Sequence, residues 1–227
     1  ITPLKGRRKK LLLADMDSTI INVECLDELA DYAGLKHEIA AITERAMRGE
    51  LEFEPALRER VRRLKGLALD ALQKAYDERV RLNAGAATLV RTMAKHGARC
   101  VLVSGGFSFF TERVAYAAGF HHDRANVLLD DGATLTGLVR EPILGRAAQT
   151  ESLESEAPAI GASPMDPLAI GDGANDLDMI KAAGLGLAYR AKPVVAAQAD
   201  AKIDHASLEA ALFFQGYRRG EFACAEQ

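Results

Sequence analysis

Short apolar runs alternate with helix-like segments over most of the chain. Four runs have the continuous apolar character of buried parallel strands, at residues 11–14, 99–103, 168–170 and 185–188. Apolar residues at helical spacing predict helices at 25–33, 86–96, 109–118, 149–157 and 177–183. A hairpin is predicted where Asp130, Asp131 and Gly132 separate two further runs, 127–129 and 134–139. Strands alternating with helices predict an α/β fold, a Rossmann-like parallel sheet with helices on both faces.

The segment from residue 35 to about residue 83 breaks this alternation. It has no β-branched runs, many charged residues, and apolar residues at helical spacing, such as Leu57, Val61 and Leu64. We therefore expect a small helical bundle, inserted as a cap after the first strand and helix. The predicted division is an α/β core of residues 1–34 and 84–227 and a helical cap of residues 35–83.

Composition argues against several classes of function. The 227 residues carry a formal net charge of -3, whereas nucleic-acid binding usually needs a strongly basic patch. No window approaches the ~18 apolar residues of a membrane span, and the basic run at 5–10 precedes too short an apolar segment for a secretory signal. The cysteines, Cys25, Cys100 and Cys224, lack metal-ligand spacing. We expect a cytoplasmic monomer or homodimer with reduced thiols, and neither nucleic acid nor membrane as a partner.

Polar residues gather directly after three of the predicted strands. The first strand runs into Asp-Met-Asp-Ser-Thr at 15–19, the second into Ser-Gly-Gly-Phe at 104–107, and the third into Gly-Asp-Gly-Ala-Asn-Asp at 171–176. Taken singly, the second segment is also typical of a tight turn and the third of a capped helix start. In a parallel sheet, ligands bind beyond the carboxyl ends of the strands. Three such segments at one edge therefore favour a functional site.

The residue types in these segments limit the chemistry. Asp15 and Asp17 would repel each other by roughly 4 kcal/mol at ~4 Å and an effective dielectric constant of ~20, so a cation or a shared proton must offset the cost. Together with Asp172 they offer hard oxygen ligands, which suit Mg²⁺ better than zinc. Ser104 and the backbone at Gly105 suit a phosphate. An aspartate can attack phosphorus, and a second carboxyl group can protonate the leaving alkoxide and then activate water.

In combination these segments make the chain similar to the phosphoserine phosphatases of the haloacid dehalogenase superfamily, over nearly its whole length. The resemblance implies that Asp15 is the nucleophile and that Asp17 is the acid/base, with its backbone carbonyl on the metal. Asp176 would support a metal ligand from the outer shell. The implied metal site comprises Asp15, Asp17, Asp172 and Asp176, and the implied substrate site on the core comprises Ser104, Gly105 and Asn175.

The same resemblance implies three further substrate contacts at or in the cap. Glu24 would bind an amino group, Arg60 a carboxylate, and Phe53 would form an apolar lid. Without the resemblance, Arg60 would be interpreted as a surface residue and Phe53 as part of the core. The residue types nevertheless suit a zwitterionic phosphate ester, which needs one anionic and one cationic partner besides the phosphate site.

We therefore expect a Mg²⁺-dependent phosphomonoesterase that hydrolyses O-phosphoserine to serine and phosphate, the last step of serine biosynthesis. Two enzyme alternatives are a phosphatase for another small phosphomonoester and a phosphotransferase that uses a second alcohol in place of water. A third alternative is a phospho-ligand-binding homologue without turnover.

One position departs from the family pattern. The pattern has a lysine near the start of the helix after Pro142-Ile143-Leu144-Gly145, where it neutralises the nucleophile and the transferring phosphoryl group. By spacing to Leu153 that catalytic position is Gln149, which carries no charge. Arg146, about one helical turn earlier, is the nearest cation in sequence. Activity is therefore expected to be impaired.

Overall fold

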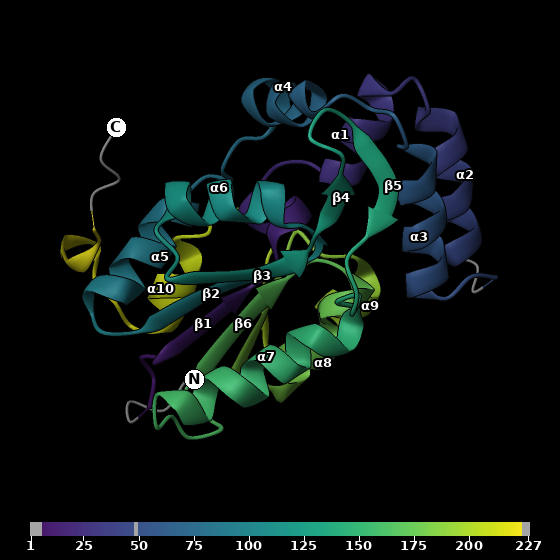
Figure 1. The fold of residues 1–227 in the computed structure, drawn as a ribbon. Helices are drawn as coiled ribbons and strands as arrows, with labels where there is room; N and C mark the ends of the chain where they lie inside the picture. Colours follow the sequence, from purple (N-terminus) through teal and green to yellow (C-terminus); the bar gives the residue numbers. More distant parts are fainter. Residues whose placement is uncertain (1–5, 48–49, 224–227) are drawn as a thin grey trace.

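The computed structural model describes residues 6–47 and 50–223, and its centre is a six-stranded sheet (Figure 1). Every pairing in this sheet is parallel, and the strand order is β3-β2-β1-β6-β7-β8. The strands are β1 Leu11–Ala14, β2 Arg99–Phe107, β3 His122–Asn126, β6 Pro167–Gly171, β7 Leu185–Tyr189 and β8 Ala201–Ile203. The predicted parallel α/β sheet is confirmed. Its strand order reverses at β1, which is where such sheets bind ligands.

Helices cover both faces of the sheet, because alternate strand residues point to opposite sides (Figure 1). Leu12 of β1 packs in the same cluster as Phe110, whereas its neighbour Leu13 packs with Leu153 on the opposite face. One face carries α5 Ala86–Lys95 and α6 Ser108–Ala118, and the other carries α7 Arg146–Ala159 and α8 Leu177–Ala182. Three short elements come later in the chain: α9 Pro193–Ala196, α10 Ala210–Phe214 and the turn η3 Arg219–Glu221. None of the helices in the described ranges is long and apolar enough to cross a bilayer.

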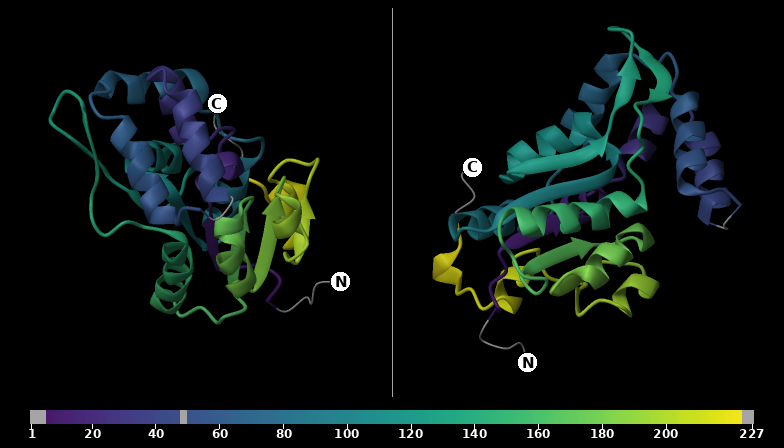
Figure 2. Two further views of the ribbon diagram at one scale, coloured as in Figure 1. Left: turned by 90° about the vertical axis from the view of Figure 1, so that its right-hand side faces the viewer. Right: turned by 60° about the horizontal axis from the view of Figure 1, so that its bottom comes forward.

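A group of helices stands over the carboxyl end of the strands (Figure 2). It contains α1 Cys25–Tyr32, α2 Lys36–Met47, α3 Phe53–Arg63 and α4 Leu69–Arg79. The antiparallel hairpin of β4 Leu128–Asp130 and β5 Leu135–Val139 packs against α3, and its backbone bonds to the α3–α4 loop through Gly66 N–H to the Leu135 carbonyl at 2.8 Å. The predicted hairpin and the helices expected in the cap are present. The hairpin, which comes later in the chain, packs against these helices and was not predicted to do so. The division at residues 34/35 and 83/84 stays a prediction.

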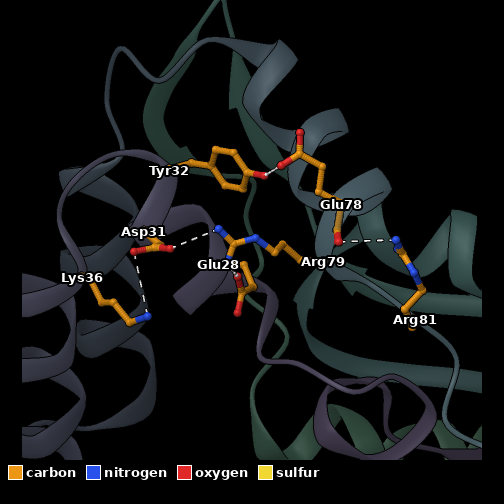
Figure 3. A network of polar contacts seen from close by, with 7 residues as sticks. All are labelled: Glu28, Asp31, Tyr32, Lys36, Glu78, Arg79 and Arg81. Carbon is orange, nitrogen blue, oxygen red and sulfur yellow. Dashed lines mark hydrogen bonds and ion pairs between the residues drawn. The ribbon is translucent and has the colours of Figure 1, made fainter.

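A polar network joins α4 to α1 and α2 (Figure 3). Arg79 pairs with Glu28 at 3.0 Å and with Asp31 at 3.4 Å. The Arg79 side chain is partly exposed, and exposed ion pairs each contribute only about 0.2–1 kcal/mol. Full burial of one leucine side chain, such as Leu72 on α4, contributes about 1.5–3 kcal/mol. The helix is therefore held mainly by its apolar face.

Several elements differ from the prediction. β2 continues through Phe107 instead of ending at Val103, and its pairing with β3 is irregular between these two residues. β3 and β8 were not predicted because their sequences, HDRAN and AKI, are polar or short, as edge strands often are. Helix α7 begins at Arg146 instead of Gln149.

Candidate active site

The turn after β1 builds the floor of the candidate site. The backbone N–H of Asp15 donates to the Ile170 carbonyl of β6 at 3.0 Å. The tight turn η1, Met16–Ile20, follows, and Ser18 within it adopts a left-handed conformation with φ of 57°. Only short polar residues and glycine adopt this conformation readily. The turn directs both Asp15 and Asp17 into one cavity.

This cavity has a volume of about 440 Å³ and is lined by residues of the core and of the cap. Its walls contain the predicted residues Asp15, Asp17, Glu24, Phe53, Arg60, Ser104, Gly105, Asp172 and Asn175. Gln149 and Asp176 lie behind the wall, where Gln149 donates to Asp15 and Asp176 accepts from the Asp172 backbone. The structure therefore brings the predicted site residues together.

Three carboxylates meet at the core end of the cavity. Asp15, Asp172 and Asp176 each offer an oxygen, and these atoms all lie within 4.8 Å of one another. Asp15 is only 5% exposed and Asp176 is fully buried. Burial raises the pKa of Asp15 well above its usual range, and the nearby Asp176 and Asp17 carboxylates raise it further. Burial likewise raises the pKa of Asp172 to about 7 and of Asp176 to about 6.

The carboxylate cluster fits a Mg²⁺ ion by its donor set. Its donors are all carboxylate oxygens, which are the hard ligands that Mg²⁺ prefers. A divalent cation would also offset the mutual repulsion that raises the pKa of these carboxyl groups. The residues present therefore agree with the metal that the sequence resemblance implies.

Asp17 lies beside this cluster and has a different environment. Its Oδ1 accepts from the Cys25 backbone N–H at 3.4 Å. Burial raises the pKa of Asp17 to about 8, with a further contribution from Glu24. A carboxyl group with this pKa is mostly protonated at neutral pH, which is the state that a general acid requires.

Asp176 organises the loop after β6 and the short turn η2, Ala174–Asp176, that follows it. Its two oxygens accept four hydrogen bonds, which come from Asp172 N at 3.1 Å, Gly173 N at 2.9 Å, Asn175 Nδ2 at 2.8 Å and Gln149 Nε2 at 2.6 Å. Asn175 therefore lines the cavity while its amide nitrogen is engaged with Asp176. The bonds offset part of the cost of burying this charge.

The predicted phosphate-binding segment is the irregular end of β2 and not a free turn after it. The Gly106 backbone N–H donates to Ser104 Oγ at 2.9 Å. Ser104 is buried, and Gly105 lies in the cavity wall. The strand continues because Phe107 pairs with Asn126 of β3 beyond the irregularity.

At the cap end, Glu24 and Arg60 supply opposite charges to the same cavity. Ser18 Oγ donates to Glu24 Oε1 at 2.6 Å, which fixes the carboxylate. Arg60 Nε donates to the Ala56 carbonyl, one turn earlier in α3, at 3.3 Å. Within the described ranges no carboxylate lies in ion-pair distance of Arg60, and burial lowers the pKa of its guanidinium. This cation is therefore available to an anionic ligand.

Gln149 occupies the position between the carboxylates that its spacing predicted. It is 3% exposed, and its Nε2 donates to Asp176 Oδ1 at 2.6 Å and to Asp15 Oδ1 at 3.4 Å. Its Oε1 is buried without a hydrogen-bond partner in the described part of the chain. Arg146 does not replace the missing charge, because its guanidinium makes two 2.7 Å bonds to Asp178.

Sequence reasoning missed Lys192 and Asn126 at this site, and it identified Thr19 in the segment after β1 without giving it a role. Lys192 lines the cavity, and its backbone N–H donates to the Asp172 carbonyl at 3.1 Å. Thr19 Oγ1 donates to Asp172 Oδ1 at 3.0 Å. Asn126 donates to the Gly105 carbonyl at 2.9 Å. The rule that ligands bind beyond the carboxyl ends of the strands, applied to β7, would have found Lys192. Asn126 is the last residue of β3, a strand that the apolar pattern did not predict.

Comparisons with known proteins agree with this geometry. A protein of Polaromonas sp. named phosphoserine phosphatase is 46% identical over 205 residues, covering 88% of this chain and 87% of the relative. A solved substrate-bound phosphoserine phosphatase complex is 38% identical, with a TM-score of 0.83 over 91% of this chain and 98% of its own. A solved phospho-aspartyl intermediate analogue of phosphoserine phosphatase has the same identity and TM-score and covers 91% of this chain and 99% of its own.

The profile of the haloacid dehalogenase-like hydrolases matches residues 12–181. This range begins in β1 and ends in α8, so it includes Asp15, Ser104, Gln149 and Asp172. By this match and by the similarity of its relatives over most of its length, the chain belongs to the haloacid dehalogenase-like hydrolase family.

Proposed function

We propose that this protein is a Mg²⁺-dependent phosphomonoesterase that hydrolyses O-phosphoserine to L-serine and phosphate, the last step of cytoplasmic serine biosynthesis. The observation that carries the proposal is the cavity with two chemically distinct ends. Carboxylates and Ser104 lie at the core end, and Glu24 and Arg60 lie at the cap end. The names of the Polaromonas relative and of the substrate-bound structural relative support the same substrate.

The proposed reaction has two steps, both centred on Asp15. In the first, an Asp15 oxygen attacks phosphorus, the bond from phosphorus to the seryl oxygen breaks, and Asp17 donates a proton to that oxygen. In the second, Asp17 takes a proton from water, the water oxygen attacks phosphorus, and the Asp15–phosphorus bond breaks. The phospho-aspartyl analogue among the structural relatives supports this path.

The buried cluster prepares Asp15 for the attack. Bound Mg²⁺ would supply positive charge that favours the ionised carboxylate and stabilises the transferring phosphoryl group. The residues that would hold it are Asp15, Asp172, the backbone carbonyl of Asp17, and Asp176. The Thr19 hydroxyl restrains Asp172 through its 3.0 Å hydrogen bond.

Two cap residues, Arg60 and Phe53, and Glu24 beside the cap would select the substrate. Arg60 would bind the carboxylate of phosphoserine, Glu24 its ammonium group, and Phe53 would cover the phosphate end. In this proposal the segment 35–83 acts as a cap on the core formed by residues 1–34 and 84–227.

The direct test is phosphate release from O-phosphoserine with and without Mg²⁺. We expect turnover that depends on Mg²⁺ and is abolished in Asp15→Asn, because an amide does not attack phosphorus. A panel of other small phosphomonoesters, assayed in parallel, serves as the control for substrate preference. Normal turnover by Asp15→Asn would exclude the mechanism.

Arg60→Ala tests the substrate assignment. The loss of a charge-assisted hydrogen bond of about 1.5–3 kcal/mol should lower kcat/KM for phosphoserine by roughly 10- to 150-fold. Phosphoethanolamine, which lacks the carboxylate, should be affected far less. Arg63→Ala is the matched control, since Arg63 lies on the same helix and pairs with Glu38 outside the cavity. Equal losses on both substrates would make Arg60 a structural residue.

In the metal-free protein, the carboxylate cluster should make the free energy of unfolding depend on pH. Asp176, Asp172 and Asp17 have pKa values of about 6, 7 and 8 in the folded protein and the usual 3.8 when unfolded. Between about pH 4 and pH 8 the folded protein therefore binds more protons at these groups than the unfolded chain does. Its stabilisation by these groups is complete below about pH 4 and is lost as the pH rises through about 6 to 8.

We expect the Tm of the metal-free protein to fall between about pH 6 and pH 8.5, and Mg²⁺ to raise the Tm more at the higher pH. Asp172→Asn removes one of the titrating groups, so its Tm should depend less on pH and respond less to Mg²⁺. A Mg²⁺ response that is identical in the two proteins would argue against a metal site here.

Gln149→Lys tests whether the missing charge limits the rate. One preorganised electrostatic group typically contributes on the order of 10²–10³ in rate, so lysine should raise kcat for phosphoserine by tens-fold or more at saturating Mg²⁺. Gln149→Met, which removes the hydrogen bonds without adding charge, is the control and should be no faster than the parent. If the parent is fast and lysine changes nothing, the charge is not limiting. If the parent and Gln149→Lys both bind phosphoserine without releasing phosphate, the result would favour the alternative of a phospho-ligand-binding homologue without turnover.

A further inference from the structure

A buried amide links two loops at the phosphate end of the cavity. Asn126, at the carboxyl end of β3, is 2% exposed. Its Nδ2 donates to the Gly105 carbonyl at 2.9 Å and to the Leu144 carbonyl at 3.0 Å, and its Oδ1 accepts from the Leu144 backbone N–H at 2.7 Å. Both donor hydrogens and the acceptor are therefore used on backbone groups.

The two loops carry different parts of the candidate active site. Gly105 follows Ser104 at the end of β2, whereas Leu144 directly precedes Gly145, the residue that caps helix α7 and leads to Gln149. No backbone hydrogen bond between these two loops is recorded in the described ranges. The Asn126 side chain is thus the polar connection that sets their separation.

Phe53 of the cap lies against both of these loops at once. A β-carbon built on Gly105 would lie 3.2 Å from Phe53 Cζ, and one built on Gly145 would lie 3.3 Å from Phe53 Cδ1. These distances are shorter than most real contacts of a β-carbon, so the absence of a side chain at both positions lets the ring approach. Two neighbouring edges of one aromatic ring, Cζ–Cε2 and Cδ1–Cε1, therefore rest on two glycines from the two linked loops.

We propose that Asn126 is a positioning residue for the phosphatase reaction, because it holds Gly105 and Gly145 at the spacing that seats Phe53. The seated ring closes the wall of the cavity at the end where Asp15 and Ser104 lie, and it keeps water away from the phosphoryl group. This inference rests on the proposed function, since it assigns the seat a role in phosphoryl transfer.

A purely structural role for Asn126 makes a different prediction, and Gln215 provides the comparison. Gln215 is 1% exposed and also uses its whole amide, on the Lys9 backbone N–H, the Ala211 carbonyl and the Met93 side-chain Sδ. It lies near the amino-terminal end of β1, away from the cavity. Loss of either side-chain amide should lower the Tm by a similar amount. Only the loss of the Asn126 amide should change the contribution of Phe53 to kcat/KM.

The experiment is a double-mutant cycle on kcat/KM for O-phosphoserine, with Tm measured for every variant. We expect Asn126→Ala and Phe53→Ala each to lower kcat/KM by about tenfold, and the double variant to be less than about twofold worse than either one, because both remove the same seat. In the matched cycle, Gln215→Ala should lower Tm by a similar amount, and its effect on kcat/KM should multiply with that of Phe53→Ala.

Gly145→Ala supplies a second test that leaves Asn126 intact. Its backbone φ of -99° suits alanine, but the new methyl group would press on Phe53. We expect a several-fold loss of kcat/KM that disappears in the Phe53→Ala background. Multiplicative losses in both the Asn126 and Gly145 cycles would overturn the proposal. If the unaltered protein hydrolyses no phosphomonoester, the proposed function fails. The same double-mutant cycles then use the affinity for inorganic phosphate in the presence of Mg²⁺, measured by calorimetry, in place of kcat/KM.

Discussion

The constraint on which this structure depends is the placement of several carboxylates at one buried point. Asp15, Asp172 and Asp176 converge there from the ends of two neighbouring strands. Their raised pKa values express the cost, which arises first from burial and then, for Asp15 and Asp172, from repulsion by neighbouring carboxylates. The fold meets part of this cost with fixed donors, four of them on Asp176. A bound cation would offset much of the remainder.

The sheet explains why such a convergence is possible at all. β1 pairs with β2 on one side and β6 on the other, so the chain leaves β1 at the place where the strand order reverses. The loops that follow β1, β2 and β6 approach one another at this place and line one cavity. The left-handed turn at Ser18 then directs the chain back over the opening toward Glu24 and the cap.

The sequence predicts the centre of this fold better than its periphery. Continuous apolar runs indicate β1 and β6 because central parallel strands are buried on both faces. β3 lacks that signal, since an edge strand contacts solvent and tolerates a sequence such as HDRAN. The site divides in the same way. Asp15, Ser104 and Asp172 follow apolar runs and are predictable, and Lys192 follows β7 closely enough for the same strand-end rule to find it. Asn126 lies on the edge strand β3 and depends on tertiary contacts that no local spacing encodes.

The bonding of the hairpin to the cap also affects how this architecture can be recombined. The backbone of the α3–α4 loop pairs with the hairpin at Gly66, Leu67 and Leu69, although the chain passes through α4, α5, β2, α6 and β3 between the two segments. A graft of residues 35–83 into another family member would need a hairpin at the same place in the recipient to satisfy these peptide groups. The cap is therefore not a module with a single pair of junctions. An exchange of the cap between relatives therefore preserves these backbone bonds only if the hairpin in the recipient matches or both segments are moved together.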